Sequence, residues 1–204
     1  MKLYIDYDTT LVDLIDPWLS WINKKYDVSL RSIDINRWYF LGEVFGPEAD
    51  DFWRSKKYNH YTDIMIYQPY FGAVAFFKTV QKLYGKENVF IVTSTRDHHT
   101  IDKLKHAKHY FNIQDEQFIT VNKEKFHKTT DGILVDDYPL HVFEHIVNNK
   151  RKGIVFNYEN RFGWCQPYNY HLDQTLSKYI DYVESSNFSV VSSYDELLKE
   201  LSYE

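Results

Sequence analysis

Short apolar runs alternate along the chain with longer stretches whose apolar residues recur every three or four positions. Six such runs predict buried strands at residues 3–5, 89–92, 118–121, 133–135, 153–156 and 188–191. Helical spacing predicts helices at residues 11–26, 73–83, 100–111, 143–149 and 172–184, and a capping box at Ser193 opens a last one. This alternation predicts an α/β fold with a doubly wound parallel sheet.

The stretch between Val28 and Tyr67 interrupts the alternation. It is polar and aromatic and contains Gly42, Gly46 and Pro47, so it predicts several short helices, among them one around residues 48–57. The length of 204 residues suffices for one buried domain that carries a modest insertion.

Composition and charge narrow the classes of partner. The net charge of −5 lacks the basic field that long nucleic acids favour, whereas a small phosphorylated substrate needs only local cations. The single cysteine, Cys165, excludes an intramolecular disulfide and indicates a reducing compartment. Met1 and Lys2 lead directly into the first predicted strand, and no apolar stretch approaches the length of a membrane span. We therefore expect a cytoplasmic protein without a signal peptide or membrane segment.

Polar residues follow three of the predicted strands. They are Asp6-Tyr7-Asp8, Thr93-Ser94 and Asp136-Asp137, and Lys103 and Lys105 lie on the predicted helix between the last two groups. Ligands of doubly wound sheets bind at the carboxyl ends of the strands. Each group alone also has a purely structural explanation, as a turn, a helix cap or a solvated charge.

The combination, in this order, favours phosphoryl transfer through an acyl-phosphate. A carboxylate that attacks an anionic phosphorus needs a divalent cation to neutralise both charges, and Mg²⁺ prefers oxygen ligands. A hydroxyl and an ammonium group can hold the remaining phosphoryl oxygens. A second carboxylate two residues after the nucleophile can protonate the leaving oxygen and then activate water.

These residues resemble the haloacid dehalogenase (HAD) superfamily of phosphatases, whose first motif, D-x-D-x-[TV], matches residues 6–10. The resemblance implies that Asp6 is the nucleophile and a metal ligand. It implies that Asp8 is the general acid/base and offers its backbone carbonyl to the metal. The phosphate-binding groups would be Thr93, Ser94 and Lys103, with Lys105 as the rival lysine, and the acidic fourth motif would be Asp136 and Asp137. The sequence leaves open which of these two aspartates contacts the Mg²⁺ directly.

Within the superfamily the chain is similar to the 5'(3')-deoxyribonucleotidases over about its first 140 residues. The residues that carry this similarity are Gln68 to Ala73, Val92 to Ser94, Asp102 to Leu104, His109 to Phe111 and Ile133 to Pro139. The resemblance implies a HAD-like core at residues 1–12 and 69–204, with a small helical cap at residues 13–68 inserted after the first strand. The departures are Thr9, where the group has glycine, and Thr10, where it has valine. A β-branched residue at position 9 narrows the freedom of the backbone beside the nucleophile.

The resemblance implies a magnesium-dependent 5'(3')-deoxyribonucleotidase that dephosphorylates deoxynucleoside monophosphates. Trp38 and Phe40 are the candidate base-contacting residues of the cap, and packing within the cap is the alternative for both. Other hypotheses are a phosphatase for another small phosphomonoester or a nucleic-acid 3'-phosphate end, and an inactive nucleotide-binding protein.

Several other polar residues are interpreted as surface groups, and residues 153–204 contribute nothing to the functional hypothesis. A phosphate contact is the alternative for four of them, although a surface charge is favoured for each: Arg96, Lys123, Lys125 and Lys128. The others are histidines interpreted as exposed helix and loop residues: His98, His99, His106 and His109.

Overall fold

A six-stranded, all-parallel sheet forms the centre of the computed structural model, which describes residues 1–50, 52, 61, 67–122 and 124–202. The strand order is β3-β2-β1-β4-β5-β6. The strands are β1 Lys2–Ile5, β2 Val89–Ser94, β3 Phe118–Val121, β4 Gly132–Asp136, β5 Gly153–Phe156 and β6 Phe188–Val191. Each coincides with an apolar run of the sequence, so the predicted α/β fold with a doubly wound parallel sheet is confirmed.

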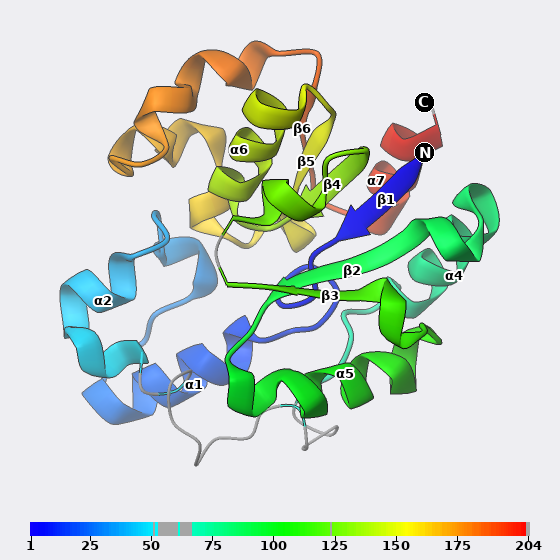
Figure 1. Ribbon diagram of the computed structural model, residues 1–204. Helices are drawn as coiled ribbons and strands as arrows, with labels where there is room; N and C mark the ends of the chain where they lie inside the picture. The colour runs from blue at the N-terminus through cyan, green and yellow to red at the C-terminus, as the bar shows by residue number, and fades with distance from the viewer. Residues whose placement is uncertain (51, 53–60, 62–66, 123, 203–204) are drawn as a thin grey trace.

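Helices cover both faces of the sheet (Figure 1). Helices α4 (Ala73–Tyr84), α5 (Asp97–Phe111) and α7 (Tyr194–Ser202) lie on one face, and α6 (Pro139–Asn149) lies on the other. The chain winds outward from β1 to β3 and then outward from β4 to β6, so right-handed crossovers place α4 and α5 on one face and α6 on the other, while α7 follows the last strand. The reversal falls between β1 and β4, which is where this class of sheet binds its ligands.

The central strands are apolar on both sides because both sides are covered. In β1, Leu3 and Ile5 pack into the larger core, while Tyr4 faces the opposite side with Val92 and Leu134. This burial fixes the register of β1 against β2 and β4, and with it the positions of the polar residues that follow each strand.

Several predicted helices differ from the observed structure in their bounds or their type, among them the one predicted at residues 143–149, which is α6 and begins at Pro139. The helix predicted from residue 11 is α1, Ile15–Tyr26, because the amides of Leu11 and Val12 donate to the carbonyl of Tyr7 in a turn after β1. The helix predicted at residues 172–184 is not one α-helix: its first residue ends the 3-10 turn Pro167–Leu172, and its second half is the 3-10 segment Ser177–Glu184. Of the helix predicted around 48–57, the described part includes the 3-10 turn Pro47–Asp50, and most of the remainder lies outside the described residues.

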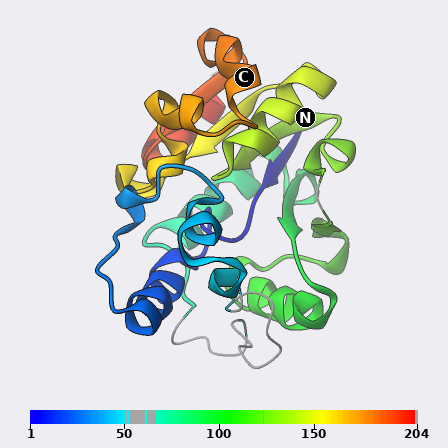
Figure 2. The same ribbon diagram turned by 90° about the vertical axis from the view of Figure 1, so that its left-hand side faces the viewer.

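The two ends of the 13–68 segment meet beside β1. Val12 pairs antiparallel with Pro69, and the Asp13 amide donates to the Gln68 carbonyl at 3.0 Å. Helices α1 and α2 (Phe40–Phe45) lie beyond the carboxyl ends of the strands, as the two views agree (Figures 1 and 2). The described part of this segment therefore faces the strand ends.

Short 3-10 turns make up most of the remaining regular structure. They are η1 Ser32–Asp34, η4 Lys86–Asn88, η5 Asp115–Gln117, η6 Lys125–Lys128, η7 Tyr158–Asn160 and η8 Gly163–Cys165. Within the described ranges, no helix combines the length and apolar character that a membrane crossing requires.

Candidate active site

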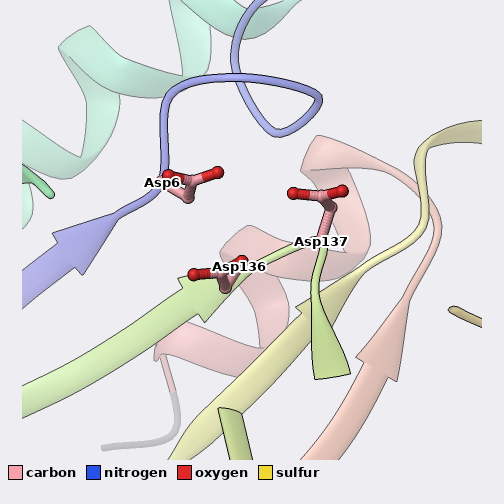
Figure 3. A group of neighbouring side chains, drawn as sticks. All are labelled: Asp6, Asp136 and Asp137. Carbon is pink, nitrogen blue, oxygen red and sulfur yellow. The ribbon is translucent and has the colours of Figure 1, made fainter. Parts of the chain in front are cut away.

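Three buried carboxylates meet where the strand order reverses. Asp6 follows β1, Asp136 ends β4, and Asp137 is the next residue, so adjacent parallel strands deliver all three to one edge of the sheet. One carboxylate oxygen from each lies within 4.8 Å of the other two. Figure 3 shows the side chains of Asp6 and Asp137 turned toward each other across a common space, with Asp136 beside them.

A buried lysine neutralises part of this charge, and the sequence interpretation of Lys125 as a surface residue is wrong. Its side chain is 2% exposed, and its Nζ atom donates to Asp6 Oδ1 at 2.5 Å and to Asp136 Oδ2 at 2.6 Å. Turn η6 carries Lys125 across the strand ends as the chain passes from β3 to β4. Helical or strand periodicity does not predict such a crossover. The signal that could have identified Lys125 is its place between the third and fourth strands, where the chain must cross the sheet.

Burial and neighbouring charges shift the pKa values of the groups in this cluster in different directions. Burial raises the pKa of Asp6 to about 6, and Lys125 opposes that rise. Burial, followed by the charges of Asp136 and Asp6, raises the pKa of Asp137 well above its ordinary value. For Asp136, the effect of burial is outweighed by Lys125 and His141, so its pKa falls. Burial alone would lower the pKa of Lys125, but the two carboxylates raise it, so the ammonium stays charged.

The two adjacent aspartates have different hydrogen-bond environments. Asp136 Oδ1 accepts from the Tyr138 amide at 2.9 Å, and its Oδ2 faces Lys125 and, at 3.1 Å, His141 Nδ1. Among the residues described, Oδ2 of Asp137 is buried without a hydrogen-bond partner. A buried, unpaired carboxylate oxygen beside Asp6 suits a hard cation such as Mg²⁺, which binds oxygen ligands. The donor set therefore fits the metal that the sequence predicts.

The remaining motif residues form a second group next to the carboxylates. Lys103, on α5, is fully buried; its Nζ atom contacts Asp8 Oδ2, donates to Thr93 Oγ1 at 2.6 Å and donates to the Ser94 carbonyl at 2.9 Å. The rival, Lys105, has a side chain that is 73% exposed and pairs with Asp102. Lys103 alone of these two lysines reaches the strand ends, because the two residues lie on different faces of the helix.

The other candidate cations and histidines divide into two sets. Arg96 and Lys128 are exposed, as the sequence predicts, although Arg96 lines the cavity described below, and Lys123 lies outside the described residues. The interpretation of His99 and His106 as surface residues is wrong, because both are buried. His106 is held between the Tyr7 hydroxyl, at 2.5 Å, and the Tyr67 carbonyl, at 2.7 Å.

The backbone three residues after Asp6 is strained at Thr9. Its φ of 63° lies in the left-handed region, which a β-branched residue enters at a cost of about 1–3 kcal/mol. The Thr9 amide donates to the Val12 carbonyl at 2.8 Å and holds the turn in place. Thr9, which stands where the 5'(3')-deoxyribonucleotidases have glycine, therefore has a backbone conformation that glycine adopts without strain.

A cavity of about 890 Å³ opens over the strand ends. Trp38 lines it and stacks on Tyr138, with ring centroids 4.2 Å apart, and meets Trp164 edge-on. Phe40 is not among its lining residues; instead, the guanidinium group of Arg37 lies over the Phe40 ring. Polar groups on the walls include Asp6, Asp8, Glu43, Thr93, Ser94, Asn122, Lys125, Asp136, Asp137, His141 and Glu144.

Comparisons with known proteins support the fold. No family model matches the chain, and no curated protein matches it. The structure is similar to that of a HAD family hydrolase from Deinococcus radiodurans R1, a structure with bound phosphate and sodium. The TM-score is 0.64 at 11% identity, over 99% of this chain and 95% of that chain. The chain therefore has a HAD-like α/β fold.

Proposed function

We propose that this chain is a magnesium-dependent phosphomonoester hydrolase that carries the phosphoryl group on Asp6. The observation that supports this most strongly is the convergence of Asp6, Asp8 and two buried lysines, Lys103 and Lys125, at the carboxyl edge of the sheet. A fold alone does not define a reaction, whereas this set of groups matches the needs of one.

The reaction has two steps. An Asp6 carboxylate oxygen attacks phosphorus, the bond from phosphorus to the leaving oxygen breaks, and that oxygen takes a proton from the Asp8 carboxyl. Water then attacks phosphorus and gives a proton to the Asp8 carboxylate, and the Asp6 carboxylate leaves. The phosphoryl oxygens would be bound by Thr93, Ser94 and Lys103. The Lys103 ammonium lies between Asp8 and Thr93, within hydrogen-bond distance of both, and so next to the place where the phosphoryl group would sit.

Mg²⁺, when bound, would supply the positive charge that lets an anionic nucleophile meet an anionic phosphoryl group. Asp6 and Asp137 would hold it, together with the backbone carbonyl of Asp8. We assign Asp136 to a different task, since both of its oxygens already bind groups of the protein. It would position Lys125 beside Asp6.

Deoxynucleoside monophosphates are the proposed substrates, and residues 13–68 the proposed cap. The cavity volume, about 890 Å³, is within the range of pockets that enclose small ligands. Trp38 adds an aromatic surface, and Glu43 and Glu144 add acceptors for hydrogen bonds from a base. A nucleobase needs both kinds of contact.

Hydrolysis should depend on a divalent cation. Excess chelator is expected to abolish phosphate release from a panel of nucleotides and sugar phosphates, because Asp6 and Asp137 would otherwise repel the phosphate. Added Mg²⁺ should restore release, with deoxynucleoside monophosphates as the best substrates. Undiminished hydrolysis in a metal-free, chelated sample would rule out the proposed mechanism.

Trp38 should contribute to substrate choice more than Phe40. Trp38→Ala is expected to lower kcat/KM for deoxynucleotides by about 5- to 150-fold, which corresponds to the stacking free energy of one base. Turnover of p-nitrophenyl phosphate should stay nearly unchanged. Phe40→Ala, which changes a ring outside the cavity lining, is the matched control. Equal losses on both substrates, with a lowered melting temperature, would show that Trp38 only joins the 13–68 segment to Tyr138.

A further inference from the structure

The carboxylate of Asp8 is held from two sides. Lys103 contacts its Oδ2 atom, and the Tyr61 hydroxyl donates to its Oδ1 atom at 2.9 Å. Lys103 belongs to the α/β core, whereas Tyr61 belongs to the 13–68 segment and is 53 residues away from Asp8 in the sequence. None of the motifs in the sequence includes Tyr61.

The Tyr61 ring is fixed by its neighbours on α5. It meets His99 and His106 edge-on, each with ring centroids 6.0 Å apart, and the Lys103 ammonium lies 5.2 Å from its centre. Burial, with the added effect of Asp8, holds the pKa of Tyr61 well above its usual value. The hydroxyl therefore stays protonated and serves as a donor.

We propose that Tyr61 is a positioning residue that orients the Asp8 carboxyl for proton transfer to the leaving group. This inference rests on the proposed function and adds a residue to it. A carboxyl group with one oxygen fixed by Lys103 and the other by Tyr61 cannot rotate about its Cβ–Cγ bond without breaking a contact. The constraint selects the oxygen that faces the leaving group, and misplacing a catalytic group by about 1 Å can cost about 100-fold in rate.

Tyr61 gains and loses no proton during the reaction. In the first step the Asp8 carboxyl gives its proton to the departing oxygen, and in the second it takes one from water. The Tyr61 hydroxyl keeps its hydrogen bond to Oδ1 throughout, so its contribution depends on how much the leaving group needs a proton. An alkoxide needs one, whereas nitrophenolate is stable without it.

The test compares the rate of leaving-group release in the first turnover for two substrates. Tyr61→Phe keeps the ring and removes the hydroxyl. It is expected to slow release from a deoxynucleoside 5'-monophosphate by about 10- to 100-fold, and release of nitrophenolate from p-nitrophenyl phosphate by less than about 3-fold. Tyr84→Phe is the matched control, because it removes a hydroxyl that bonds the Leu201 carbonyl, at the opposite end of the sheet.

A double-mutant cycle separates positioning from general loosening. If Tyr61 acts through Asp8, adding Tyr61→Phe to Asp8→Asn should slow the nucleotide reaction by no more than about 2-fold beyond Asp8→Asn alone. Equal slowing on both substrates, additive effects in the cycle, or no slowing by Tyr61→Phe would overturn the inference while leaving the phosphatase proposal in place. A wild-type chain that hydrolyses neither substrate would remove both.

Discussion

Asp6→Asn is expected to reduce turnover to less than about one ten-thousandth of the wild-type rate, because an amide cannot form the acyl-phosphate. The loss should be the same on nucleotides and on p-nitrophenyl phosphate, since every substrate passes through the same attack. Steady-state phosphate release in Mg²⁺ measures the effect.

Two controls accompany this substitution. Asp115→Asn, which changes an exposed carboxylate paired with Lys108, should leave turnover unchanged. The melting temperature of Asp6→Asn should show a folded protein, because Lys125 retains its contact with Asp136. Turnover by Asp6→Asn near the wild-type rate would show that the nucleophile lies elsewhere.

Lys125→Met is expected to affect stability and rate together. It leaves Asp6 and Asp136 buried without their shared counter-charge, and breaking a buried ion pair costs about 3–5 kcal/mol of unfolding free energy. Turnover should fall by about 100- to 1000-fold, the usual effect of losing one group that stabilises transition-state charge. Denaturant unfolding without divalent cations and steady-state kinetics with Mg²⁺ measure the two effects.

The matched control is Lys128→Met, which removes an exposed lysine from the same turn. It should change unfolding free energy by no more than about 0.5 kcal/mol. Added Mg²⁺ should raise the melting temperature of Lys125→Met more than that of the wild type, because the bound ion would neutralise buried negative charge that Lys125 no longer compensates. Similar stabilities for Lys125→Met and Lys128→Met would contradict the assignment of Lys125 to the carboxylate cluster.

The sheet and three of its strand ends could be predicted because they depend on local patterns. Apolar runs locate the strands, and the residues after those runs, such as Asp6 and Asp136, must lie at the carboxyl edge once the sheet is parallel. Periodicity alone leaves Lys103 and Lys105 as rivals, because the helix face that turns inward depends on how α5 packs. Only the resemblance of the neighbouring residues favours Lys103.

Lys125, Tyr61 and the partner of Trp38 could not be predicted for a common reason. Each depends on a contact between segments far apart in the chain, made by a residue outside any strand or α-helix. Lys125 is buried because η6 crosses the strand ends, and Tyr61 is buried because its ring packs against His99 and His106 of α5. Trp38 stacks on Tyr138, 100 residues later, in a way that no periodicity encodes.

The phosphorylated state of Asp6 can be measured directly. The wild-type protein would be mixed with substrate and Mg²⁺, quenched in acid and treated with borohydride, which reduces an aspartyl-phosphate to homoserine. Peptide mass spectrometry is expected to find homoserine at position 6 in samples with substrate, and aspartate at position 6 in samples without it. Homoserine at another aspartate, or none at position 6 during active turnover, would contradict the proposal that the phosphoryl group is carried on Asp6.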